Sequence, residues 1–217
     1  MPEFWCQQPR WNIHERQVPF GSYMSYDVET SCATYVIVCG EDNPLIQMVK
    51  NRLKAIFSEV SSDANVNTMR HARDPFLLHS MISHEALVEA KDIVKKLRMR
   101  LYDQLDTVDK YAENPSDRKI LENLTIQLHA VSQDTDSLIS SAEMAEMIAE
   151  RMLSAHARFV SLKNPVEIRD VLEKHVDSLN YLKSSVQSQK RWLLGYKSRK
   201  DIAMNLVSRT PLESRLY

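Results

Sequence analysis

Residues 164–207 read NPVEIRDVLEKHVDSLNYLKSSVQSQKRWLLGYKSRKDIAMNLV, and the pattern of this stretch decides the fold class. Mostly apolar side chains recur there in alternating steps of four and three residues. We call these positions the seam: Ile168, Leu172, His175, Leu179, Leu182, Val186, Gln189, Leu193, Tyr196, Lys200, Ala203 and Val207. A seam of this period predicts one long helix that packs on other helices in coiled-coil fashion. At a rise of 1.5 Å per residue, the helix would be about 65 Å long.

The pattern leaves two arrangements of this helix open. In the first, the helix is a stalk that packs on the preceding helices for part of its length and on other chains elsewhere. Self-association, or binding of a helical protein partner, is then expected through the seam. In the second, the helix belongs to a three-helix bundle whose seam faces only its own chain. Because the pattern ends after Val207, we expect residues 208–217 to form a disordered tail.

The prolines in the middle of the chain mark the expected helix starts. Each follows an Asn or an Asp, at Asn43-Pro44, Asp74-Pro75, Asn114-Pro115 and Asn164-Pro165. An Asx side chain can accept a hydrogen bond from a free backbone N–H, and proline at the first helical position has no donor to lose. The sequence therefore predicts four helices, of which the last three are long.

The two central helices are expected to form an antiparallel hairpin over residues 74–163. Apolar residues follow the helical period from Leu78 to Ala112 and again from Ile120 to Phe159, with almost no loop between the two runs. Ser140 with Glu143 resembles a capping box, so we expect the second of these helices to break or kink there.

The N-terminal part reads as an extended arm over residues 1–31 and a small α/β element over residues 32–73. A strand is predicted at 33–39, where the sequence is ATYVIVC, and a second strand is suggested near Ile13 to Val18. The expected fold class is therefore mainly α, with a small N-terminal α/β element, a long antiparallel helical hairpin and a long C-terminal stalk helix at 164–207.

Composition excludes several functions. The chain has 217 residues, a net charge of −1 and only 3 glycines, which argues against a phosphate-binding loop and against bulk attraction to nucleic acid. No nucleophile motif is present, so we expect no enzymatic activity. The 3 cysteines do not suggest a disulfide framework, and we expect neither a signal peptide nor a transmembrane segment. A cytoplasmic location fits the chain as it stands.

Two groups of possible metal ligands carry little weight. His79 and His84, next to Glu85, are five residues apart, which turns them to different faces of a helix. A row of carboxylates at Asp103, Asp106 and Asp109 could hold hydrated Mg²⁺ loosely, or could simply be a solvated polar face. We therefore assign no catalytic, cofactor-binding or metal-ligating residue from these patterns.

A basic run without acidic residues precedes the end of the seam. It contains Lys183, Lys190, Arg191, Lys197, Arg199 and Lys200, with Trp192 and Tyr196 among them. Such cations favour the C-terminal dipole of a helix, and they are also typical of a segment close to an anionic membrane surface. Binding of nucleic acid has little support from one short stripe.

Five runs resemble the soluble N-terminal part of fungal CorA-like magnesium transporters, and the likeness covers about nine-tenths of the chain. The runs are RWNIHERQVPF (10–20), ATYVIVCG (33–40), LYDQLDTVD (101–109), QLHAVSQD (127–134) and YKSRKDIAMNLV (196–207). The resemblance implies an α/β region and a helical hairpin on a stalk that leads into the first of two membrane spans. It also implies a pentamer gated by Mg²⁺ bound between cytosolic domains.

The chain departs from that family where ions would pass. Both spans and the Gly-Met-Asn pore motif are absent, and Ala203-Met204-Asn205 lies inside the predicted stalk. The resemblance therefore implies a truncated cytosolic regulatory domain that cannot conduct ions by itself, with Mg²⁺ as its only implied cofactor. Full-length relatives would be membrane proteins. The alternative is a free-standing helical or coiled-coil interaction protein with no transport role.

Overall fold

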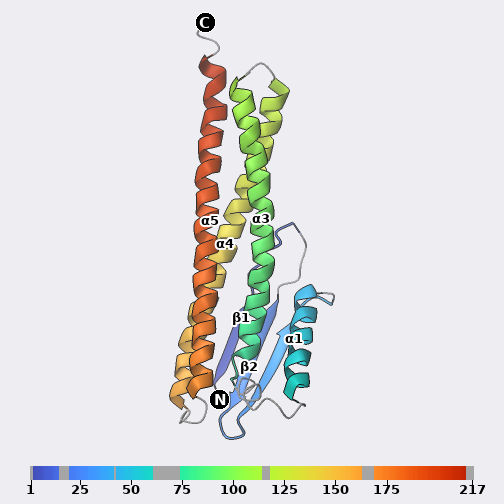
Figure 1. The fold of residues 1–217 in the computed structure, drawn as a ribbon, viewed down its shortest axis with the longest axis vertical. Helices are drawn as coiled ribbons and strands as arrows, with labels where there is room; N and C mark the ends of the chain where they lie inside the picture. Colours follow the sequence, from blue (N-terminus) through green and yellow to red (C-terminus); the bar gives the residue numbers. More distant parts are fainter. Residues whose placement is uncertain are drawn as a thin grey trace.

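A computed structural model describes residues 2–14, 20–41, 43–60, 74–113, 118–162 and 169–213. The fold is mainly helical with a small antiparallel sheet, which confirms the expected fold class. Its elements are β1 (Glu3–Gln7), β2 (Gly21–Asp27), β3 (Cys32–Val38), α1 (Pro44–Val60), α3 (Leu77–Glu113), α4 (Arg118–Leu162) and α5 (Arg169–Glu213). The three long helices lie side by side as a rod, with the sheet and α1 at one end and the C-terminal end of α5 at the other (Figure 1).

The sheet has the order β1-β2-β3 with both pairs antiparallel, and Tyr23 of β2 lies opposite Trp5 and Val36. The strand predicted at 33–39 is confirmed as β3, shifted by one residue. The other two strands, residues 3–7 and 21–27, come from the segment interpreted as an extended N-terminal arm. The strand suggested from Ile13 is wrong for residues 13–14, which form a turn, while residues 15–19 lie outside the described part.

Two of the four predicted helix starts fall in the described part of the chain, and both use the Asx side chain. The backbone N–H of Leu45 donates to Asn43 Oδ1 at 2.9 Å, and that of Phe76 donates to Asp74 Oδ1 at 2.7 Å. The first helix begins at Pro44 as predicted, whereas α3 begins at Leu77 after a turn. The two remaining Asn-Pro pairs lie outside the described residues.

The two longest helices are more continuous than the sequence predicted. No break occurs in α4 at Ser140, and its hydroxyl donates to the carbonyl oxygen of Asp136 at 3.1 Å, one turn earlier in the same helix, instead of capping a new one. The predicted disordered tail is wrong for residues 208–213, since α5 continues through Glu213. Extending an existing helix costs far less than starting one, so a weak local pattern does not end it.

The seam is buried within its own chain. Every described seam residue from Leu172 to Val207 is at most 9 % exposed, because α5 packs on both α3 and α4. Within this chain the described seam therefore packs as the bundle arrangement predicts, and binding of a partner through the seam stays a prediction. One apolar core runs from the sheet along most of the rod. A second, smaller core at the far end contains Val108, Leu124, Leu128, Ala203 and Val207.

Among the described residues, none of the helices combines the length and the apolar character that crossing a membrane requires.

Candidate functional site

A carboxylate and two imidazoles meet where the sheet end joins all three long helices. Asp74 precedes α3, His156 lies near the end of α4, and His175 lies in the first turns of α5. Asp74 Oδ2 is 2.7 Å from His156 Nε2 and 2.7 Å from His175 Nδ1. An ionised carboxylate can only accept hydrogen bonds, so both rings donate to this one oxygen. We call these three residues the Asp74 cluster.

The Asp74 cluster is buried, and its hydrogen bonds keep the carboxylate charged. Asp74 and His156 have fully buried side chains, and the side chain of His175 is 11 % exposed. Burial alone would raise the pKa of Asp74, but the hydrogen bonds and positive potential of His156 and His175 hold this pKa well below its usual range. Nearby, the Tyr35 hydroxyl donates to the carbonyl oxygen of Pro75 at 2.5 Å, and burial beside the negative Asp74 raises the Tyr35 pKa.

The donor set suits a transition metal ion better than Mg²⁺. Two imidazoles and one carboxylate are typical ligands of Zn²⁺ and similar ions, whereas Mg²⁺ prefers oxygen. A metal-bound imidazole normally donates its other N–H to an acceptor, and His156 Nδ1 has no such partner among the described residues. The observed distances already satisfy Asp74 by hydrogen bonds. The arrangement therefore fits a buried hydrogen-bonded junction between three helices better than a metal centre.

Sequence reasoning missed this cluster because its members are far apart in the chain. Asp74 was interpreted only as a helix cap, which it also is, and His175 only as a seam position. A histidine in a mostly apolar seam was the available indication, since a buried imidazole needs a polar partner.

The metal ligands considered from the sequence do not come together. His79 is fully buried among aromatic rings, 5.1 Å from Phe4 and 5.9 Å from Tyr35 between centroids. Burial lowers the pKa of His79 to about 4. Glu85 instead pairs with Arg52 of α1 at 2.6 Å. In the part of the chain that the structure describes, the Asp74 cluster is the only group of three such ligands, so His79, His84 and Glu85 form none.

The basic run of α5 is largely neutralised inside the chain. Its lysines form ion pairs with acidic residues of α4 and, in one case, with a neighbour on α5. The pairs are Lys183–Glu150 (2.9 Å), Lys190–Glu143 (3.4 Å), Lys190–Glu146 (3.2 Å), Lys197–Asp136 (2.7 Å) and Lys200–Asp201 (2.5 Å). Arg199 lies over the Tyr102 ring at 5.5 Å. These contacts account for most of the run, so it gives little support to the expectation of a nearby membrane surface.

A groove with a volume of about 580 Å³ lies between α3 and α5. Lys91, Lys95 and Arg98 line it from α3, and Tyr181, Gln189 and Trp192 line it from α5. Gln189 is 6 % exposed, and neither its amide oxygen nor its amide nitrogen has a hydrogen-bond partner among the described residues. Trp192, by contrast, is 63 % exposed at the groove's edge.

The carboxylate row considered for Mg²⁺ lies on the same helix, farther from the sheet. Asp103, Asp106 and Asp109 are all exposed on α3, and none of them makes an ion pair with another described residue. Their exposure is that of a solvated polar edge, one of the two interpretations given above.

Comparison with protein-family models, with curated proteins and with solved structures finds no significant match. The resemblance to CorA-like transporters therefore rests on the sequence runs given above.

Proposed function

We propose that this chain is the cytosolic regulatory region of a CorA-like divalent-cation transporter. The five sequence runs support this proposal, and so does the arrangement of a small sheet with α1, a helical hairpin and a long helix, which the resemblance implies. The observation that carries it is the continuous 45-residue α5, which leads from the sheet end of the rod to its far end (Figure 1). A stalk helix would connect a regulatory domain to a membrane part in this way.

Mg²⁺ responsiveness is the property to test. The melting temperature and sedimentation coefficient of the purified chain would be measured as MgCl₂ rises to about 10 mM, against NaCl of equal ionic strength. A ligand that binds only the folded form at 100 times its Kd adds about 2.7 kcal/mol to stability. For a chain of this size, we expect the melting temperature to rise by roughly 5–10 °C. If neither quantity distinguishes MgCl₂ from NaCl, the proposal is wrong.

A second candidate function is a free-standing helical interaction protein. The buried seam and the paired lysines favour it, because the two features that suggested a membrane stalk are satisfied within the chain. Such a protein would not respond to Mg²⁺ but would bind through another exposed surface. The titration above separates the two candidates.

A further inference from the structure

The wall that α3 contributes to the groove between α3 and α5 is basic. Lys91, Lys95 and Arg98 line it, and their spacing of four and three residues places them on one side of the helix. All three side chains are exposed. At 1.5 Å per residue, the row is about 10 Å long. None of the described residues that line the groove is an Asp or a Glu, so the charges of its lining are all positive.

The cations of the groove lack the ion pairs that neutralise the neighbouring helix. Lys183, Lys190 and Lys197 of α5 each pair with a carboxylate of α4. The three cations on α3 form no ion pair with any described residue. Like charges one helical turn apart repel each other, so the row weakens α3 while nothing is bound. A bound anion would relieve that repulsion.

The wall that α5 contributes carries aromatic rings and hydroxyl groups. Tyr181 and Trp192 are both exposed there, and the Trp192 ring lies 6.4 Å from the buried ring of Tyr196, with 31° between the two planes. Ser185 and Ser188 also line this wall. An exposed indole is a platform on which a flat ring can stack, and a hydroxyl can donate to a phosphate oxygen.

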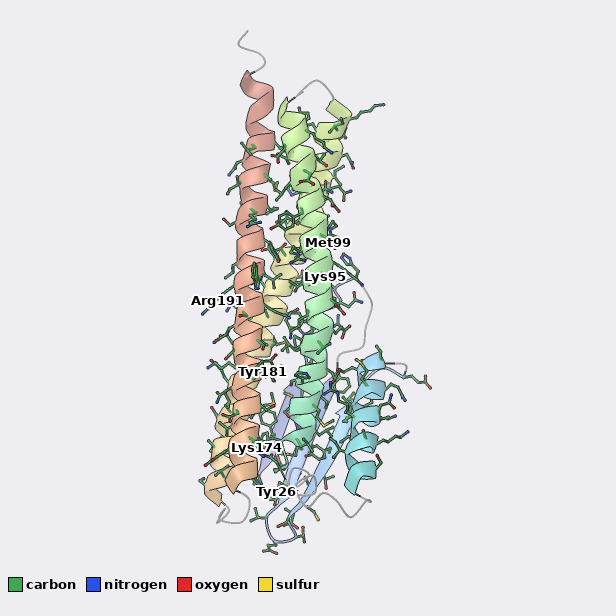
Figure 2. All side chains as sticks on the ribbon, viewed as in Figure 1. Tyr26, Lys95, Met99, Lys174, Tyr181 and Arg191 are labelled. Carbon is green, nitrogen blue, oxygen red and sulfur yellow. The ribbon has the colours of Figure 1, made fainter. Side chains whose placement is uncertain are left out.

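The dimensions of the groove suit a small organic molecule. Its volume of about 580 Å³ lies within the range of roughly 300–1,000 Å³ that is usual for ligand pockets. Along α5 its lining runs from Tyr181 to Tyr196, about 22 Å of helix. Figure 2 shows Lys95 on α3 in the middle part of the rod, with Tyr181 of α5 nearer the sheet end. An elongated molecule can therefore contact the cations of one wall and the rings of the other.

The two walls together select the chemistry of that molecule. Three cations in a row match a chain of phosphates, because lysine binds a phosphate as a point charge and arginine binds it through two hydrogen bonds. The exposed indole matches a flat ring. A nucleoside polyphosphate joins a chain of phosphates to a flat ring, whereas a peptide of acidic residues supplies the charges without the ring.

We propose that the groove between α3 and α5 binds a nucleoside polyphosphate in its metal-free form. The phosphates pair with Lys91, Lys95 and Arg98, and the base stacks on Trp192. Mg²⁺ bound to the phosphates would cancel two of their negative charges, and the described lining offers no carboxylate to hold the ion in return. This site does not rest on the proposed function, and it is compatible with either of the two candidate functions.

Isothermal titration calorimetry of the full chain with ATP in EDTA tests the proposal. We expect binding with a Kd below about 1 mM. Inorganic triphosphate lacks the ring and adenosine lacks the charges, so each should bind at least about fivefold more weakly than ATP. MgCl₂ in excess over ATP, compared with NaCl of equal ionic strength, should weaken ATP binding by at least about fivefold, because the chelated nucleotide carries less charge.

Substitutions in the two walls separate their roles. Lys95→Ala with Arg98→Ala should weaken ATP binding by at least about tenfold, since each side chain makes a charged hydrogen bond. Trp192→Ala should weaken it by at least about fivefold, whereas Trp192→Phe keeps a ring for stacking and should restore most of the affinity. All of these side chains are exposed, and circular dichroism verifies that the variants are folded.

Matched controls are available outside the groove. Lys50 and Lys54 of α1 are also exposed, and Lys50→Ala with Lys54→Ala removes the same charge from another surface. Leu194 is exposed on α5 but does not line the groove, so Leu194→Ala matches the truncation of Trp192. Both control variants should bind ATP like the wild type.

Several results would overturn the proposal. They are no ATP binding at about 1 mM, triphosphate binding as tight as that of ATP, equal or tighter binding in MgCl₂, and control variants that lose as much affinity as the groove variants. A polyglutamate peptide that binds more tightly than ATP would instead assign the groove to an acidic protein partner. Any of these results leaves the Mg²⁺ titration described above unaffected, because that titration contains no nucleotide.

Discussion

Asp74 Oδ2 and His175 Nδ1 lie 2.7 Å apart, although the two residues belong to the start of α3 and the first turns of α5. The same oxygen also accepts from His156 of α4. A single buried carboxylate thus holds three helices in register at the sheet end of the rod. Its removal affects contacts between elements that are far apart in sequence.

Replacement of Asp74 by Ala should destabilise the fold strongly. The change leaves two buried imidazoles without their acceptor and removes the cap on the N–H of Phe76. Breaking a buried charged pair costs about 3–5 kcal/mol. Urea unfolding at neutral pH measures the loss. The exposed ion pair of Asp136 with Lys197 gives the control, since Asp136→Ala should cost at most about 1 kcal/mol. Equal losses in the two variants would contradict the role of the Asp74 cluster.

The Asp74 cluster should also make stability depend on acid. Because the pKa of Asp74 is lowered in the folded chain, its contribution is full above the unfolded pKa of about 4 and is lost as pH falls below it. The difference in unfolding free energy between the wild type and Asp74→Asn should therefore be largest above pH of about 5. It should shrink steadily as pH falls toward about 2. A difference that does not change over this range would be evidence against a charged Asp74.

His79 should produce a second loss of stability as pH falls, in a range above that of Asp74. Its pKa is lowered to about 4 by burial, so the folded chain favours the neutral ring, whereas the unfolded chain protonates it near pH 6.5. The stabilisation from a neutral His79 is complete above about pH 6.5 and decreases as pH falls toward 4, by about 3 kcal/mol in total. His79→Leu, which suits the surrounding aromatic rings, should flatten the unfolding free energy between these pH values. Persistence of the slope in this variant would assign it to other groups.

Two adjacent leucines of α5 test whether the seam is buried within one chain. Leu193 is 0 % exposed and Leu194 is 48 % exposed. Leu193→Ala should cost about 2–5 kcal/mol, because it removes packed methyl groups and leaves a cavity, whereas Leu194→Ala should cost well under half of that. Both losses should be independent of protein concentration in dilute solution. A cost for Leu193→Ala that appears only when the chain is concentrated would mean that the seam packs on another copy.

The sequence predicted the structure best where a feature depends on residues that are close together in the chain, such as a helix cap. Asn43 and Asp74 cap helices as their place before proline predicted, and the three-four period of the seam predicted which side of α5 is buried. The capping-box pattern at Ser140 does not end α4, because continuing a helix costs far less than starting a new one. Local patterns predict helix starts well but do not decide whether a helix that has begun will stop.

Contacts between distant segments could not be predicted from one sequence. The Asp74 cluster joins residues 82 and 101 positions apart, and only the packing of the bundle determines that they meet. The strands near the N-terminus were missed for a similar reason, because β2 becomes a strand through its pairing with β1 and β3. The lysines of α5 were also ambiguous until α4 supplied their carboxylates.

The second apolar core at the far end, with Leu124 and Val207 among its members, is separate from the main core. That end lacks the sheet and has no counterpart of the Asp74 cluster among its described residues. Local unfolding should therefore begin at the far end of the rod and progress toward the sheet. Backbone amides around Leu124 should accordingly exchange their hydrogens sooner than those around His156.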